Sequence, residues 1–189
     1  MARSLSEQRL TARKPARWSA GRICLAVLAI DLALTVLLLL MGNEFLPGSA
    51  PLELWSDDSS PVHNSQHVAD YFSLSHFVFG MALFGVFAFQ TPDWSIRSRF
   101  ILTAASSAVW EAVENTPLVV SRFHGVDGYT GDSIVNSLSD TAFSALGFAA
   151  AAALPAWLSV AGAVLLEMTT SLMIRNGIIL GAVKVFLDG

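Results

Sequence analysis

The chain has a single cysteine, Cys24, among its 189 residues. One cysteine excludes an intramolecular disulfide framework and a zinc site built on cysteine pairs. The sequence also has no H-E-x-x-H motif, the helical signature of zinc metalloproteases. Any metal or catalytic site would therefore be built from carboxylates, imidazoles, amides and hydroxyls.

Charged residues are also scarce. Asp, Glu, Lys and Arg make up 14% of the chain, whereas an ordinary soluble domain has about 25%. Hydrophobic residues account for 53%, and many of them stand in long uninterrupted runs. This composition excludes an ordinary soluble domain and is typical of an integral membrane protein.

Five apolar stretches have about the length of a transmembrane helix. They predict an all-α polytopic membrane helix bundle, with a basic tail over 1–22 and one transmembrane domain over 23–189. The late apolar segment IILGAVKVFL is too short to cross a bilayer, so a C-terminal half-helix is expected there. The predicted spans are about 23–41, 71–89, 100–117, 132–154 and 156–174.

The basic residues predict the orientation of the bundle. Six of the eleven Lys and Arg residues lie within the first 22 positions, and such a bias marks the cytoplasmic side. A basic tail can also bind nucleic acid, but this tail leads directly into a span, so we expect no nucleic-acid partner. The chain is therefore predicted to be a multi-pass membrane protein with a cytoplasmic N-terminus. The polar segment 43–70, the loop 121–131 and the C-terminus are expected on the periplasmic side.

Ionisable side chains interrupt three of the predicted spans at a matched depth. His76 lies near the outer end of the second span, Glu111 and Glu114 near the outer end of the third, and Asp132 and Asp140 in the outer turns of the fourth. Burying a charged group in hydrocarbon costs at least about 2–3 kcal/mol. The simplest interpretation is one polar site beneath the periplasmic face.

The polar residues of two spans are spaced as single helical faces. These faces are Glu111, Glu114 and Asn115 in the third span, and Asp132, Asn136 and Asp140 in the fourth. Lipid would tolerate neither face, so both are expected to point inward. Carboxylates held this close need shared protons, basic partners or a bound cation, because like charges disfavour ionisation.

Three interpretations of the polar residues stay open. In a metal site, imidazole and carboxylate ligands would hold a divalent ion, and the candidates are His67, His76, Glu114, Asp132 and Asp140. In a metal-free acid–base site, the candidate catalytic residues are Glu111, Glu114, Asp140 and His76. Residues that would bind the substrate or orient the site are Asn115, Asn136, Asp132 and Arg175. In the third interpretation the same groups form interhelical hydrogen bonds that lock the bundle. The sequence does not determine the cofactor, and a divalent metal is one alternative.

Several polar strings carry a resemblance to a known family. They are NSQHVADYFSLSHFVFG, WEAVENTP, GYTGDSIVNSLSDTAFSALGF and LPAWLSVAGAVLLEM with the later IRNG. In this order they resemble the bacterial membrane family named domain of unknown function 2585, from about Asn64 to the end of the chain. The candidate site residues apart from Arg175 fall on the motif positions of that family. The resemblance implies a multi-pass protein of the bacterial inner membrane and supplies no activity.

A second likeness concerns the pattern alone. The order of polar residues is similar to that in small VanZ-like membrane proteins. It consists of a polar residue before a glycine in one span, an acidic residue in the next, and then D-x-x-x-N-x-x-x-D. We transfer no function from this pattern.

The leading functional hypothesis is a periplasm-facing polar site of His, Glu, Asp and Asn that binds or modifies a lipid or lipid-linked head group. One alternative is a non-catalytic structural or accessory subunit of a membrane complex, and another is a proton or cation pathway. Expected partners are membrane lipids and, under the accessory hypothesis, other membrane subunits. Whether the chain is an enzyme is left open.

Overall fold

The computed structural model describes residues 18–48, 51–58, 60, 63–123, 129 and 131–174. Over these residues the chain forms six helices and no strand, which confirms the predicted all-α fold. The helices are α2 (Ala20–Met41), α3 (Tyr71–Gln90), α4 (Ile96–Glu114), α5 (Pro117–Phe123), α6 (Ile134–Ala153) and α7 (Ala156–Ile174). The predicted basic tail, apart from residues 18–22, and the predicted C-terminal half-helix lie outside the described residues.

Polar caps and turn residues set the ends of the helices. Ser95 caps α4, so that helix begins at Ile96 rather than near position 100 as predicted. Asp70 and Ser73 form a capping box at the start of α3, in which each side chain accepts from the backbone of the other. Gly42 ends α2 in the left-handed conformation, with a φ of 95° that favours glycine. Pro117 begins the short helix α5, where its missing N–H costs no hydrogen bond.

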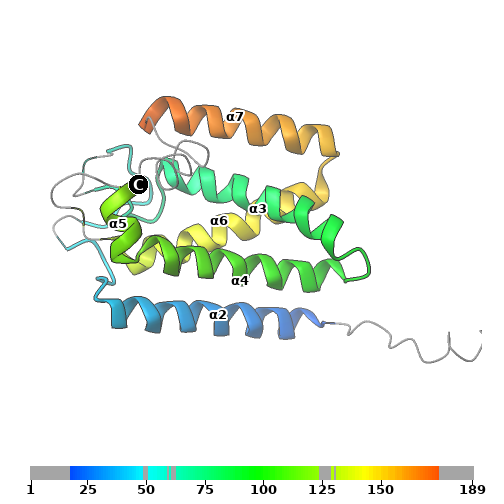
Figure 1. The fold of residues 1–189 in the computed structure, drawn as a ribbon, viewed down its shortest axis with the longest axis horizontal. Coiled ribbons are helices and arrows are strands. Elements are labelled where there is room, and N and C mark those ends of the chain that lie inside the picture. Colours follow the sequence, from blue (N-terminus) through cyan, green and yellow to red (C-terminus); the bar gives the residue numbers. More distant parts are fainter. Residues whose placement is uncertain are drawn as a thin grey trace, which may run out of the picture.

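The helices lie side by side in a layered bundle (Figure 1). The most extensive packing is between α3 and α6, and α4 packs on α6 as well. Helix α2 lies against α4 at one edge of the bundle, and α7 lies against α3 at the opposite edge. The three central helices α3, α4 and α6 therefore enclose the interior.

Two glycines allow α3 and α6 to approach closely. A Cβ atom at Gly80 would lie 1.9 Å from the backbone oxygen of Ser144, and one at Gly147 would lie 1.9 Å from the backbone oxygen of Phe77. Neither position has room for a side chain because the obstacle is backbone. The close approach brings Ser144 within reach of the carbonyl oxygen of His76, to which its hydroxyl donates a 3.0 Å hydrogen bond.

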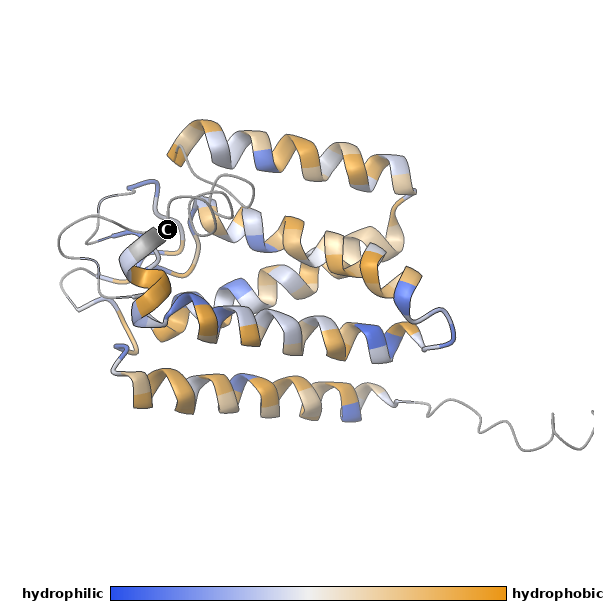
Figure 2. Cartoon of the chain, in the orientation of Figure 1, coloured by the Kyte–Doolittle hydropathy of each residue, from blue (hydrophilic) through white to orange (hydrophobic). Residues whose placement is uncertain are grey.

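The outer helices carry an apolar surface that no described part of the chain covers. Leu40 is 81% exposed, Trp157 is 70% exposed and Leu172 is 74% exposed, and Figure 2 shows hydrophobic residues along most of α2 and α7. By length and composition, α2, α3 and α7 are apolar enough to cross a membrane. Helices α4 and α6, with 19 and 20 residues, are not among these candidates because they carry polar residues inward. The structure therefore supports three of the five predicted spans.

The loops at one end of the bundle cap the start of α6. The first backbone N–H groups of a helix have no partner within the helix. Here the N–H of Ile134 donates to the carbonyl oxygen of Glu44 at 2.9 Å, and that of Val135 to the carbonyl oxygen of Phe45 at 3.2 Å. The N–H of Ser133 donates to the carbonyl oxygen of Ser65 at 3.0 Å. The polar segment that follows α2 is thereby tied to α6 by its backbone.

Replacing Gly80 with alanine is expected to destabilise the bundle by about 1–3 kcal/mol, the usual range for overpacking a close contact. The added Cβ collides with backbone at Ser144, so α3 has to move away from α6. The matched control is Gly85→Ala in the same helix, where a Cβ meets nothing within 4 Å. Thermal unfolding in detergent measures both variants. Equal melting temperatures for the two variants would contradict the close approach.

Candidate functional site

The space between α3, α4 and α6 is filled largely by polar side chains. In this region the fully buried residues, each with 0% exposure, include Ser73, Thr103, Ser107, Glu111, Asn136, Ser137 and Ser144. Buried polar groups need partners inside the protein, and more so where lipid surrounds the bundle. Several of them pair between helices, as in the 2.9 Å hydrogen bond from Ser107 to Ser144.

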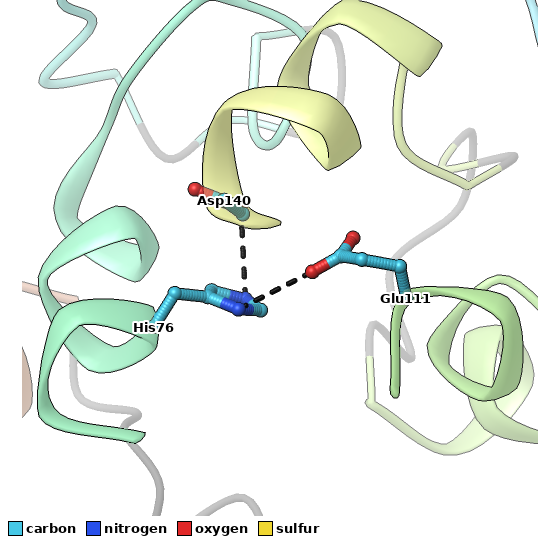
Figure 3. Close-up of side chains that lie close together, drawn as sticks. All are labelled: His76, Glu111 and Asp140. Atoms are coloured by element: carbon cyan, nitrogen blue, oxygen red, sulfur yellow. Dashed lines mark ion pairs between the residues drawn. The ribbon is translucent and has the colours of Figure 1, made fainter. Parts of the chain in front are cut away.

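His76 lies at the centre of this polar region, with carboxylates on both sides of its ring. Its Nδ1 is 3.2 Å from Glu111 Oε1, and its Nε2 is 3.7 Å from Asp140 Oδ2 and 3.9 Å from Glu114 Oε2. Figure 3 shows the His76 ring of α3 between the carboxylates of Glu111 on α4 and Asp140 on α6. Side chains from three helices thus meet at one point, as the matched depth in the sequence predicted.

Glu111 has the least satisfied carboxylate of the cluster. Its side chain is fully buried, and neither of its oxygens has a hydrogen-bond partner. Nδ1 of His76 has no hydrogen-bond partner either, so the 3.2 Å contact between the two groups is not aligned as a hydrogen bond. Leaving a buried charged acceptor unpaired costs more than about 1–3 kcal/mol, so this carboxylate requires a partner.

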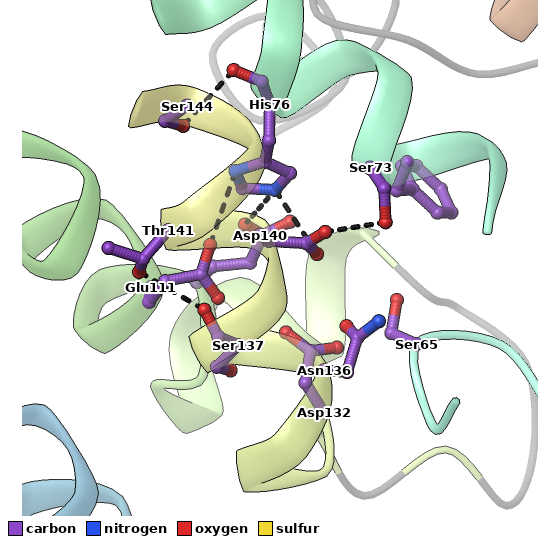
Figure 4. Close-up of polar contacts among 12 residues, drawn as sticks. Ser65, Ser73, His76, Glu111, Asp132, Asn136, Ser137, Asp140, Thr141 and Ser144 are labelled. Atoms are coloured by element: carbon purple, nitrogen blue, oxygen red, sulfur yellow. Dashed lines mark hydrogen bonds and ion pairs between the residues drawn. The ribbon is translucent and has the colours of Figure 1, made fainter. Parts of the chain in front are cut away.

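The carboxylate of Asp140 is oriented by α3. Ser73 Oγ donates a 2.6 Å hydrogen bond to Asp140 Oδ1, which leaves Oδ2 facing His76 (Figure 4). The same Ser73 hydroxyl accepts from the backbone N–H of Asp70 at 3.2 Å. Burial raises the pKa of the Asp70 carboxyl, although backbone N–H groups, including that of Phe72, donate to it and lower the pKa. The Ser73 hydroxyl therefore takes part both in the N-terminal cap of α3 and in the orientation of Asp140.

A second polar corner surrounds Asp132, just before α6. Asn115 Nδ2 donates to Asp132 Oδ2 at 3.0 Å, and the backbone N–H of Asp132 donates to Asn115 Oδ1 at 2.8 Å. Asn43 donates to the same Asn115 oxygen at 2.7 Å, and the Tyr129 hydroxyl donates to Asp132 Oδ1. Burial raises the pKa of Asp132 to about 6, against the lowering effect of the hydrogen bonds from Tyr129 and Asn115. The ends of α2 and α4 and the start of α6 are joined here.

Two groups of possible metal ligands share Glu111. The first group is His76, Glu111 and Asp140, and the second is Glu111, Glu114 and Asp132. In each group one ligand atom per residue lies within 4.8 Å of the others. In the described part of the chain, the only side chain that forms an ion pair with these carboxylates is His76. Their negative charge is therefore poorly balanced by the protein.

Two of the predicted site residues, His67 and Asn136, are not part of the cluster. His67 does not join the cluster: the backbone N–H of Glu53 donates to its Nδ1 at 3.2 Å, and its Nε2 lies 3.0 Å from Nδ1 of His63. Asn136 borders the cluster and donates to the backbone oxygen of His67 at 2.9 Å. Arg175 lies outside the described residues. Both ring nitrogens of His67 therefore have partners outside the cluster, and His67 is not one of its ligands.

Sequence reasoning missed Ser73, Asn43 and Tyr129. Ser73 precedes His76 by three residues and so lies on the same helical face, a signal that was present in the sequence. Asn43 follows the end of α2, where no periodic pattern could connect it to Asn115. Tyr129 lies in a loop, and its contact with Asp132 depends on the fold of that loop.

The comparisons with known proteins identify relatives of this chain. The family described as "Protein of unknown function (DUF2585)" matches residues 38–187. A UPF0314 protein of Agrobacterium fabrum is 34% identical over 95% of this chain and 90% of its own length. UPF0314 proteins of Brucella anthropi and Sphingopyxis alaskensis are 35% and 31% identical, over 91% and 82% of this chain and 89% and 85% of their own lengths. No solved structure matches the chain.

Replacing Asn115 with alanine is expected to destabilise the protein by about 1–3 kcal/mol, because the Asp132 N–H and the Asn43 amide lose a buried partner. The neighbouring Thr116→Ala is the control, since the Thr116 hydroxyl makes an exposed hydrogen bond to Val113 within its own turn. Chemical unfolding in detergent measures the difference. A Thr116→Ala variant as unstable as Asn115→Ala would show that the Asp132 corner is not a stabilising junction.

Proposed function

The chain belongs to the DUF2585 family of bacterial proteins, and on that premise we propose that it is a multi-pass inner-membrane protein with a divalent-metal site beneath the periplasmic face. Through the bound ion it binds the head group of a lipid or lipid-linked molecule. The observation that carries this proposal is the meeting of His76, Glu111 and Asp140 from three helices. Both oxygens of the buried Glu111 carboxylate lack a hydrogen-bond partner at that point.

The spacing of the donor atoms supports a metal ion. Metal–ligand bonds to imidazole nitrogen and carboxylate oxygen are about 2.0–2.2 Å, so donors on one ion lie roughly 3.0–3.5 Å apart. The contacts of 3.2 Å to Glu111 and 3.7 Å to Asp140 are close to these separations. One imidazole with several carboxylates is a ligand set that suits zinc, manganese or iron.

The depth of the cluster supports a head group as the bound molecule. His76 lies five residues after the start of α3, which is about 7–8 Å along a helix. The polar segments that flank Asp70 and Asp132 cover this end of the bundle. A metal ion at this depth is within reach of phosphate or hydroxyl groups at the membrane surface. The oxygen ligands of such groups would complete its coordination.

The five-span arrangement is part of the proposal. Helices α4 and α6 have 19 and 20 residues, long enough to cross about 28–30 Å of hydrocarbon. They run beside α3 in the same bundle, and their polar faces turn toward each other rather than toward lipid. Arg97 and Arg99 follow the turn between α3 and α4, at the end of the bundle away from the cluster. Basic residues at that end favour its placement in the cytoplasm.

A second candidate function is a structural or accessory membrane subunit. It is favoured by hydrogen bonds that join helices without any ligand, such as Ser73 to Asp140 at 2.6 Å and Ser107 to Ser144 at 2.9 Å. In that case the polar interior holds the bundle together and no metal is bound. The two candidates differ in metal content and in the effect of neutral, isosteric substitutions.

The variant Asp140→Asn is expected to lower the bound divalent metal at least tenfold, because it removes an anionic ligand while keeping the shape of the side chain. The experiment is elemental analysis of the detergent-purified full chain after dialysis against zinc or manganese. His63→Gln is the control, since His63 contacts His67 and Asp58 outside the cluster. A wild-type protein without bound metal, combined with an Asp140→Asn variant that loses only stability, would favour the structural alternative.

Single cysteines are expected to report the orientation of the chain. In a Cys24→Ser background, Asp57→Cys in the exposed segment before α3 should react with a membrane-impermeant maleimide in intact spheroplasts. Asp93→Cys, exposed in the turn between α3 and α4, should react only after permeabilisation. Residue 57 and residue 93 lie on opposite sides of the membrane in the proposed topology. The reverse labelling pattern would overturn the orientation, and labelling of both from outside would overturn the span between them.

A further inference from the structure

We infer that the polar interior holds two divalent ions that share the carboxylate of Glu111 and together bind a phosphate group. This inference rests on the proposed metal site and extends it in number of ions and in ligand class. The two ligand groups draw on different parts of the fold. The first group, with His76 and Asp140, joins α3, α4 and α6. The second group, with Glu114 and Asp132, joins α4 to the segment just before α6.

Glu111 has the features of a bridging ligand. It belongs to both groups, and the ligand atoms within each group lie no more than 4.8 Å apart. A carboxylate that bridges two ions needs both of its oxygens, and both oxygens of Glu111 are buried without a hydrogen-bond partner. Asp140 is held by a donor from Ser73 and Asp132 by one from Asn115, whereas Oε2 of Glu114 is also buried without a hydrogen-bond partner. Glu111 is the residue common to both groups, and neither of its oxygens is held by an aligned hydrogen bond.

The charge of the cluster also favours two ions over one. When ionised, Glu111, Glu114, Asp132 and Asp140 carry a formal charge of −4, and neutral His76 adds nothing. One divalent ion leaves a charge of −2 buried between helices, where an unpaired charge costs several kcal/mol. Two divalent ions bring +4 and balance the four carboxylates. No lysine or arginine among the described side chains pairs with them.

The surrounding hydrogen bonds fit the role of ligand orientation. Ser73 Oγ binds one oxygen of Asp140 and leaves Oδ2 facing His76. Asn115 and Tyr129 donate to the two oxygens of Asp132, and each of these oxygens keeps a second lone pair for a metal. Donors of this kind fix ligand carboxylates in metal sites. Each corner of the cluster therefore has its own orienting partner.

The ligand class follows from the coordination that the protein leaves open. Each ion would have three protein donors, with Glu111 counted in both groups, and divalent ions of this type take about four to six ligands. Open positions on two neighbouring ions, about 3.5–4 Å apart, bind two oxygens of one phosphate. The chemistry is the same for a phosphorylated lipid head group and for free phosphate, so the source of the phosphate is left to experiment.

The number of ions is tested by manganese loading of the full chain in detergent, measured by elemental analysis and by electron paramagnetic resonance. Wild-type protein is expected to bind two manganese ions per chain with a spin-coupled spectrum. His76→Gln and Asp132→Asn are each expected to retain one ion, from opposite corners, and to lose the coupling. His63→Gln is expected to keep both ions. Circular dichroism identifies any variant that has not folded.

The possible ion counts separate this inference from the proposed function. Two ions that depend on different corners support both. One ion in the wild type, unaffected by Asp132→Asn, overturns the two-ion arrangement and leaves the metal site of the proposed function in place. No bound ion in the wild type, with His63→Gln equally empty, overturns both.

The phosphate is tested on the manganese-loaded protein in two arms. Inorganic phosphate is one probe, and phosphatidic acid in mixed micelles is the other, with phosphatidylcholine micelles as the matched lipid without a phosphate monoester. The measurement is the broadening of the phosphorus nuclear magnetic resonance signal of the probe by the bound manganese. We expect broadening with the wild type, and broadening at least fivefold smaller with Asp132→Asn. Stronger binding of phosphatidic acid identifies a lipid source, and stronger binding of inorganic phosphate identifies a free one. No broadening by either probe overturns the assignment of phosphate.

Discussion

The burial of the Glu111 carboxylate is the constraint on which the rest of the polar interior depends. This side chain has 0% exposure and contacts His76 at 3.2 Å without an aligned hydrogen bond. A buried and unpaired charge costs several kcal/mol, and natural folds rarely leave one. The neighbouring helices supply donors to Asp140 and Asp132, whereas both oxygens of Glu111 and Oε2 of Glu114 lack an aligned hydrogen bond. The difference between Glu111 and the hydrogen-bonded Asp140 and Asp132 is the reason to regard Glu111 as a candidate ligand.

The packing of the bundle explains why the polar groups converge. Gly80 and Gly147 bring the backbones of α3 and α6 together, and the same contact places His76 of α3 close to Asp140 of α6. Helices α2 and α7 cover the flanks with apolar side chains, of which Leu34 and Leu38 of α2 are buried against Ala108 of α4 and Ile134 of α6. Helix packing in lipid gains little from hydrophobic burial, so small residues and interhelical polar contacts have the larger share. The site and the packing therefore use the same helix faces.

Much of this arrangement could be predicted from the sequence, and the limits have physical causes. Apolar runs and polar caps gave the ends of most helices to within a few residues, and matched depth in three spans gave the convergence of His76 with Glu111. The place of His67 could not be predicted, because it depends on a turn in which Ser65 has a positive φ of 54°. Five spans were predicted, yet α4 and α6 are too polar to qualify by composition alone. Their polar faces contact each other and α3, and hydropathy does not record such pairing.

Neither ionisation nor protonation alone gives Glu111 a satisfied environment. As a carboxylate it has four lone-pair sites and no aligned hydrogen bond, and His76 can neutralise one acid of the cluster at most. As a neutral acid it becomes an O–H donor that needs an acceptor, and the 3.2 Å contact with His76 Nδ1 could serve only one of its two oxygens. In the proposed metal site, bound cations would satisfy both oxygens and would also offset the charges of Asp140 and Glu114 beside them. The unpaired Glu111 carboxylate is therefore the observation that favours the proposed binding site over a polar core that serves packing alone.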